Sequence, residues 1–261
     1  MKHIIVGLLL LCSGSLRAQP SENPLADMAM SSLLHHQTET TIQPLTVRSL
    51  VIPAACLTYG FLALRNHDLL ALNHSTRAEL QEDHPHFMTP VDNYLQFSPG
   101  LAVFGLHALG IPGKHSLGDQ SILYGMTILL STAVVFPLKS ITHEQRPDQS
   151  GYNSFPSGHT TMAFASAEFL RQEYENISCW YGVAGYAVAT ATGILRMYNN
   201  KHWLSDIVAG AGMGILSARV VYWIYPRIRE IGGKKKFSRS VVMPFYQQGG
   251  GGLAWVYHFG S

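Results

Sequence analysis

Long apolar blocks alternate with polar stretches along most of the chain. The apolar blocks lie at residues 50–64, 97–113, 121–138, 179–195 and 203–225. A further block, 158–174, is amphipathic and carries charged residues only towards its end. None of these blocks shows the two-residue alternation of a half-buried strand, so each is predicted to be helical. The body of the protein is therefore expected to be all-α.

The block at 121–138 is the clearest candidate for a membrane span, because it is uncharged and close to the ~20 residues that cross a bilayer. The block at 179–195 and the sequence GAGMG at 210–214 are rich in small residues, which let helices pack closely in lipid. Together the blocks predict a multi-pass membrane helical bundle of about five or six spanning helices. The smaller number applies if 97–113, which His107 interrupts, does not cross.

The two ends of the chain differ from this body. Residues 1–18 are typical of a secretory signal peptide, with Lys2 before a short apolar run. Residues 19–45 form a polar leader, and 46–228 form the membrane domain. The remaining residues, 229–261, form a basic and glycine-rich tail in which two short β-like runs flank a glycine turn.

The basic tail also predicts the orientation, because Lys and Arg favour the cytoplasmic side of a membrane. The polar loops at 139–157 and near 196–203 then face the other side, which for an exported bacterial protein is the periplasm. Crossings by 50–64 and 121–138 return the chain to that side, so 97–113 is expected to be a re-entrant or surface element. An uncleaved signal anchor is the alternative. We expect a multi-pass protein of the bacterial inner membrane.

Composition agrees with a membrane protein. Hydrophobic residues make up 47% of the chain and charged residues 13%, against about 25% charged residues in soluble domains. Mean hydropathy is +0.10. The net charge of +2 is too weak to indicate a nucleic-acid partner, and there is no basic stripe with interleaved aromatic residues. The sequence gives no indication of an oligomeric state.

Three polar motifs stand out against the apolar background. They read KSITHEQRP at 139–147, PSGH at 156–159 and RMYNNKHWLSD at 196–206. Their conspicuous cations, which lack three nearby acids to pair them, are Lys139, Arg146 and Arg196. Unpaired cations favour an anion, and the arginine fork suits phosphate oxygens. Ser157 and Gly158 are predicted at a helix start, where N–H groups and the helix dipole attract the same ligand.

The same motifs contain reactive groups. His202 and Asp206 are four residues apart at the predicted start of a helix, so they are expected to share a face. An Asp that accepts from one imidazole nitrogen leaves the other free as a nucleophile or base. His159, at a separate helix start, is a candidate general acid for a leaving oxygen. The set predicts phosphoryl transfer without a metal.

Simpler interpretations exist for these residues. A cation at a helix end can extend to the membrane interface, and a His–Asp pair can be a surface hydrogen bond. The two histidines with Asp206 could also bind zinc, although three neighbouring cations would repel the metal.

The motifs resemble those of the type 2 phosphatidic acid phosphatase (PAP2) family, whose pattern is K-x6-R-P, then P-S-G-H, then S-R-x5-H-x3-D. Every element is present in order over about residues 97–226, with one departure: Leu195 replaces the usual Ser. The resemblance implies that His202 forms a phosphohistidine, supported by Asp206, while His159 protonates the leaving group. It implies that the phosphoryl oxygens are held by Lys139, Arg146, Ser157, Gly158 and Arg196. No metal ion or cofactor is expected.

The membrane body then implies a lipid phosphate in the bilayer as substrate. Lipid A, undecaprenyl diphosphate, phosphatidylglycerol phosphate and phosphatidic acid are the options that the family offers in bacteria. Three other functions remain open: a soluble periplasmic non-specific acid phosphatase, a vanadium haloperoxidase, and a non-catalytic membrane protein that binds lipid headgroups.

Overall fold

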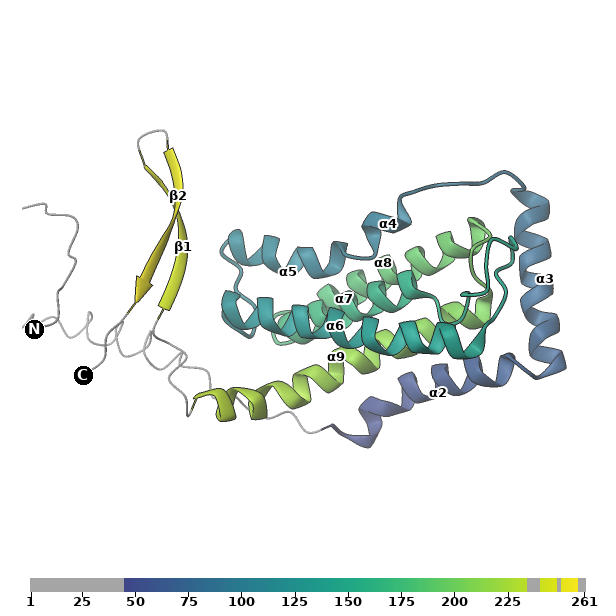
Figure 1. Cartoon of the computed structure of the whole chain (residues 1–261), viewed down its shortest axis with the longest axis horizontal. Coiled ribbons are helices and arrows are strands. Elements are labelled where there is room, and N and C mark those ends of the chain that lie inside the picture. Colours follow the sequence, from purple (N-terminus) through teal and green to yellow (C-terminus); the bar gives the residue numbers. More distant parts are fainter. Residues whose placement is uncertain (1–44, 234–239, 248–249, 258–261) are drawn as a thin grey trace, which may run out of the picture. The chain divides into compact units, whose positions relative to one another are not determined.

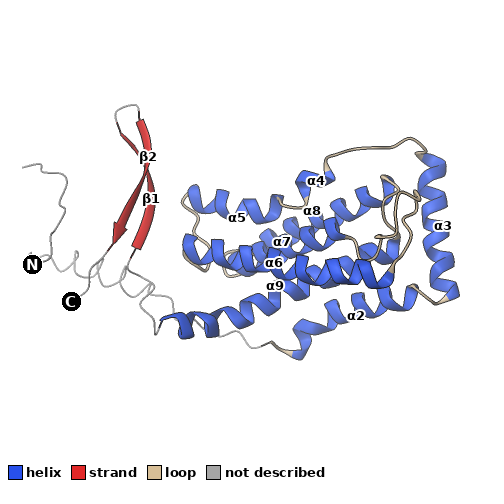
Figure 2. Cartoon of the chain, viewed as in Figure 1, coloured by secondary structure: helices blue, strands red, loops and turns tan. Residues whose placement is uncertain are grey.

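The computed structural model describes residues 45–233, 240–247 and 250–257. The predicted signal peptide at 1–18 and the leader up to residue 44 lie outside the described residues. The polypeptide forms, in order, α2 (Val47–Ala63), α3 (His67–Asp83), α4 (Asp92–Leu95), α5 (Ser98–Ala108), α6 (Leu117–Thr142), α7 (Gly158–Tyr174), α8 (Cys179–Tyr198), α9 (Leu204–Gly233), β1 (Ser240–Gln247) and β2 (Gly250–Tyr257). The prediction of an all-helical body is confirmed (Figure 2).

The two β-like runs of the tail also form as predicted. Strands β1 and β2 pair antiparallel, from Ser240 opposite Tyr257 to Gln247 opposite Gly250. The helix before them, α9, continues past the predicted boundary at 228 as far as Gly233.

Helix α7 is the centre of the bundle. It packs along α8 and α9, and α5 and α6 also contact it, while α2 lies along α9 (Figure 1). The small residues of α9 permit this packing, as the sequence GAGMG predicts. A Cβ atom on Gly214 would collide with the Thr161 carbonyl of α7, and one on Gly210 would lie 2.8 Å from the Ser157 carbonyl oxygen. The site at the start of α7 is thus held directly against α9.

Helices α6 and α9 are long and apolar enough to cross a membrane, and α2 with α3 forms a third candidate span that bends by 93°. Only 28% of the apolar window of α6 is buried within the protein. Leu129 and Phe136 of this helix are 69% and 66% exposed. Such an apolar outer surface fits contact with lipid. The count of five or six spans stays a prediction.

The expectation that residues 97–113 form a re-entrant or surface element stays a prediction. They contain α5, which has 11 residues and a length of about 16 Å, roughly half the thickness of the hydrocarbon core. This helix is too short to cross the bilayer by itself, and it packs on α7.

Candidate active site

The three sequence motifs meet at one end of the bundle. Motif 139–147 covers the end of α6 and the following loop, and PSGH leads into α7. The third motif links the end of α8 to the start of α9. Because α6 ends where α9 begins, the site lies at the same end of two candidate membrane spans.

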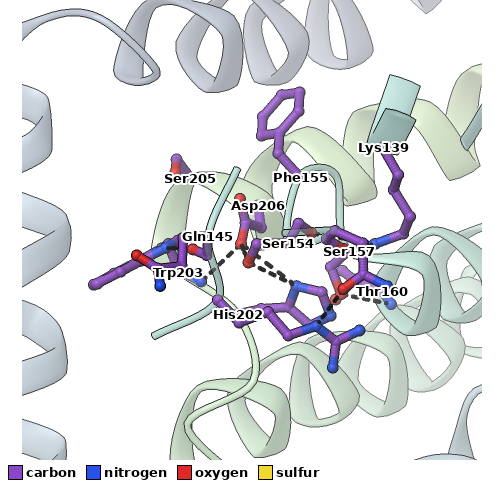
Figure 3. Close-up of polar contacts among 12 residues, drawn as sticks. Lys139, Gln145, Ser154, Phe155, Ser157, Thr160, His202, Trp203, Ser205 and Asp206 are labelled. Atoms are coloured by element: carbon purple, nitrogen blue, oxygen red, sulfur yellow. Dashed lines mark hydrogen bonds and ion pairs between the residues drawn. The ribbon is translucent and has the colours of Figure 1, made fainter. Parts of the chain in front are cut away.

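His202 is buried, with 3% of its surface exposed. Its Nδ1 lies 3.4 Å from Asp206 Oδ2 and 3.4 Å from Ser154 Oγ. Ser154 in turn donates a hydrogen bond of 2.5 Å to Asp206 Oδ2 (Figure 3). The predicted His–Asp pairing is therefore present as a long contact that Ser154 helps to bridge. With Nδ1 turned to this pair, Nε2 is the nitrogen left for chemistry.

The shared helix face predicted for His202 and Asp206 is wrong, because α9 begins at Leu204 and His202 lies in the preceding loop. Asp206 stands in the first turn instead and accepts from the Trp203 backbone N–H at 2.9 Å. A carboxylate that reaches back to the N–H before its helix is half of a capping box. Asp206 thus fixes the loop that carries His202.

Two of the three cations lie against the loop before α7. Lys139 donates to the carbonyl oxygens of Asn153 at 2.5 Å and Ser154 at 3.3 Å. Arg146 donates from Nε to Asn153 Oδ1 at 2.8 Å. Neither bond neutralises a charge, since carbonyl and amide oxygens are uncharged acceptors. Both cations keep their positive charge for a ligand.

Arg196 differs from Lys139 and Arg146 because a carboxylate is its direct partner. Its NH1 donates to Asp92 Oδ2 at 2.7 Å, and both side chains are buried. Its Nε is buried with no hydrogen-bond partner within the described part of the chain. Arg196 is thus oriented by Asp92, which lies far away in sequence. The unpartnered Nε–H leaves donor capacity for a phosphate oxygen.

The start of α7 is also more engaged than the sequence predicts. Ser157 is the N-cap: its Oγ accepts from the Thr160 N–H at 3.4 Å and the Thr160 hydroxyl at 2.9 Å. The backbone N–H of Ser157 donates to the Asp206 carbonyl at 3.1 Å. Ser157 therefore joins α7 to α9. Gly158 lies beside Lys139, where an added Cβ would be 3.9 Å from Cε, so the glycine is not required by crowding.

His159 lies on the first turn of α7, outside the two long candidate spans. Its Nε2 is 2.7 Å from the Asn93 side-chain oxygen. Burial, followed by the charge of Arg196, lowers the pKa of His159 to about 4. Burial and the nearby cations Lys139, Arg196 and Arg146 hold the pKa of His202 well below its usual value as well. These shifts show that the predicted cations and histidines share one strongly positive site.

Sequence reasoning missed three contributors: Ser154, Asp92 and Asn93. Ser154 lies two residues before Pro156 of the PSGH motif. Its position in a polar loop next to that motif was a usable signal. Asp92 and Asn93 belong to the polar stretch 66–96, which nothing in the sequence connects to the motifs.

A cavity of about 310 Å³ opens beside Arg196. It is lined by Met88, Thr89, Pro90, Asp92, Asn93, Arg196, Asn199 and Lys201. A second, of about 180 Å³, runs between α6 and α7 and reaches Lys139 and Gly158. Within the described ranges, no group of three or more His, Cys, Asp or Glu residues is arranged to hold a metal ion.

Comparison with known proteins gives consistent matches. Residues 120–230 match the model of the PAP2 superfamily. The chain is 41% identical to a lipid A 1-phosphatase of Porphyromonas gingivalis over 139 residues, which are 53% of this chain and 31% of that protein. It is 30% identical over 206 residues to a probable diacylglycerol pyrophosphate phosphatase 1 of Schizosaccharomyces pombe, covering 72% of this chain and 65% of that protein.

The match thus spans about a third of the first relative and less than two thirds of the second. Among solved structures, the chain is similar to a transmembrane PAP2 type phosphatidylglycerolphosphate phosphatase of Bacillus subtilis. The identity is 18% and the TM-score 0.47, over 72% of this chain and 98% of that one.

Proposed function

We propose that this chain, whose residues 120–230 belong to the PAP2 superfamily, is a metal-independent phosphatase of membrane lipid phosphates or diphosphates that works through a phosphohistidine. One observation carries the proposal. The buried His202 turns Nδ1 to Asp206 and Ser154 while three cations and a second histidine surround it. A nucleophile, an acid and a cationic cradle are the parts that phosphoryl transfer needs.

In the first step, Nε2 of His202 attacks phosphorus. The N–P bond forms as the bond to the leaving oxygen breaks, and His159 gives a proton to that oxygen. Lys139, Arg146 and Arg196 stabilise the charge on the three equatorial oxygens, with Gly158 at the positive end of α7. Asp206 and Ser154 stabilise the imidazole as it gains positive character.

In the second step, water attacks the phosphohistidine. His159, now neutral, accepts a proton from that water, the N–P bond breaks, and phosphate leaves. The lowered pKa of His159 does not conflict with its role as an acid. A phosphate dianion among the cations would offset the charges that repel the imidazolium, and so would raise its pKa.

The position of the site supports a lipid substrate. The end of α6 and the start of α9 meet there, so a phosphate bound by Lys139 and His202 lies at the boundary of two candidate membrane spans. The apolar outer surface of α6 makes a soluble acid phosphatase the weaker candidate. The similarity to a lipid A 1-phosphatase favours lipid A among the bacterial lipid phosphates.

The orientation of the site is part of the proposal. The sequence after Arg229, which follows the other end of α9, is basic. Basic residues favour the cytoplasmic side of a membrane, so that end of α9 is placed in the cytoplasm. The active site then faces the periplasm of a bacterial inner membrane.

The test is phosphate release by the detergent-purified chain from lipid A, undecaprenyl diphosphate, phosphatidylglycerol phosphate and phosphatidic acid, with and without EDTA. His202→Ala is the matched inactive variant. Release that EDTA does not affect and that the variant loses is expected. Release that EDTA stops, or none from any lipid, would overturn the proposal, and halide oxidation with added vanadate would then identify a haloperoxidase.

A further inference from the structure

The short helix α4 contributes two adjacent side chains to the site, although it lies outside all three sequence motifs. Asp92 holds Arg196, as described above. Asn93, the next residue, contacts His159. Two adjacent residues of α4 therefore contact one proposed phosphate-binding cation and the proposed general acid.

We propose that Asp92 and Asn93 are positioning residues for this reaction, with Asp92 aiming Arg196 at the phosphate and Asn93 aiming His159 at the leaving oxygen. The inference rests on the proposed function, because it assigns the two residues to the chemistry of that site. It adds a role for a segment that the sequence motifs do not include.

The geometry around Asp92 supports the first half. Its Oδ2 accepts from Arg196 NH1 at 2.7 Å and from Asn199 Nδ2 at 3.1 Å. Asn199 also donates to the Thr89 carbonyl at 2.9 Å, which ties α4 to the end of α8. Because Asp92 is 1% exposed, its carboxylate is held firmly. One edge of the guanidinium is thereby fixed, while its Nε–H has no partner among the described residues and can donate to a phosphate oxygen.

The contact of Asn93 supports the second half. An amide oxygen accepts only, so its 2.7 Å contact keeps a proton on Nε2 of His159. A second proton then resides on Nδ1, from which it passes to the leaving oxygen. The ring returns to its neutral form still bonded to Asn93, and Nδ1 takes the proton of the attacking water. Asn93 thus serves His159 as Asp206 serves His202: it holds one ring nitrogen so that the other reacts.

Charges on every side also act on His159. They are Arg196 of α8, Asp92 of α4, Lys139 of α6, Arg146 in the loop after it, and His202. Asp92 is the group that favours the protonated ring most strongly, whereas the cations disfavour it. The two residues of α4 therefore act in the same direction on the acid.

The experiment compares Asn93→Leu with Asn93→Asp. Asn93 is exposed, so neither change should prevent folding. Leucine removes the acceptor, which should lower the pKa of His159. The alkaline limb of the pH profile of kcat should then move to lower pH by about half to one unit. At neutral pH, kcat should fall about tenfold. Aspartate keeps an acceptor and adds charge, so the limb should move to higher pH. KM should change little in either variant.

Gln96→Leu is the matched control. The Gln96 side chain follows α4 and donates to the Asn93 backbone carbonyl oxygen, so its loss should leave the alkaline limb in place. Asp92→Asn should instead raise KM severalfold, because Arg196 loses its anchor. If both Asn93 variants reduce the rate without moving the limb, or if neither changes it, the positioning role is wrong.

A readout without turnover separates this inference from the proposed function. The pKa of His159 can be measured by NMR of histidine-labelled protein, with His159→Gln to assign its signal. It should fall in Asn93→Leu and rise in Asn93→Asp whether or not any lipid is hydrolysed. An unchanged pKa in both variants would overturn the inference, and inactivity of the wild-type chain on every lipid would overturn only the proposed function.

Discussion

The two ends of α7 both carry buried charge, but the charges are arranged in opposite ways. Towards its end, Glu168 is bound by Arg171 and Arg219, each at 2.8 Å, and by the Tyr186 hydroxyl. Glu173 is bound by His115 at 2.7 Å and by Gln120 and Tyr222. At its start, three cations face two histidines, and only Arg196 has a carboxylate as a direct partner.

The presence or absence of a charged partner distinguishes charged groups that stabilise the fold from those that can bind a ligand. A buried carboxylate surrounded by its donors is satisfied and has no need of a ligand. A set of cations bonded only to neutral oxygens remains attractive to an anion. The sequence shows charged residues of this block only towards its end, and the cations near its start come from other segments. Which of these charges are paired becomes visible only in three dimensions.

The largest effect is expected at the nucleophile. His202→Ala should reduce turnover at least about 10⁴-fold, because no other described group occupies the same place beside Asp206. Binding of inorganic phosphate or vanadate should be largely retained, since the cations are untouched. Phosphate release and equilibrium binding measured on the same preparation check both parts. Turnover close to that of the wild type would show that another residue is the nucleophile.

A smaller effect is expected when one cation is removed. Arg146→Ala should weaken binding and turnover together, by about 10²–10³-fold in kcat/KM, because the proposed role of Arg146 is to contact the phosphate in both the ground state and the transition state. Steady-state kinetics on the best lipid of the panel give the value. Glu175→Gln offers a control for changing a charge at the far end of the helix, and a loss there as large as in Arg146→Ala would contradict the comparison.

The three candidate motifs could be recognised from sequence because each is short and contiguous. Residue types and spacing, with the resemblance to the PAP2 pattern, predicted Lys139, Arg146, His159, Arg196 and His202 in one site. The start of α7 was predicted at the residue where it lies. What spacing could not give were contacts between distant segments. Asp92 meets Arg196 across more than a hundred residues, and only the packing of α4 on α8 creates that pair. The helix start at Leu204 depended on a cap that Trp203 and Asp206 form locally.

The charges at the start of α7 also predict a pH effect. Burial and the nearby cations lower the pKa of His202, so the imidazole stays neutral, and able to attack, below its usual range. The acid limb of kcat/KM should therefore lie below pH 6.5. Arg146→Gln removes one repelling charge, raises the pKa of His202 and should move that limb to higher pH by a fraction of a unit. A pH profile of the two proteins on one substrate checks this, and a shift to lower pH would contradict it.

The smallest effect on chemistry is expected from the far end of α7. Glu168→Gln leaves Arg171 and Arg219 in place without their shared carboxylate, and breaking such a buried pair costs about 3–5 kcal/mol of folding free energy. The melting temperature should fall, while kcat and its pH profile, measured well below that temperature, should match the wild type. Asn93→Leu is the opposite case, with a changed pH profile and an unchanged melting temperature. If Glu168→Gln also moved the pH profile, the charges around Glu168 would influence the histidines of the active site. The division of α7 into a structural end and a functional end would then be wrong.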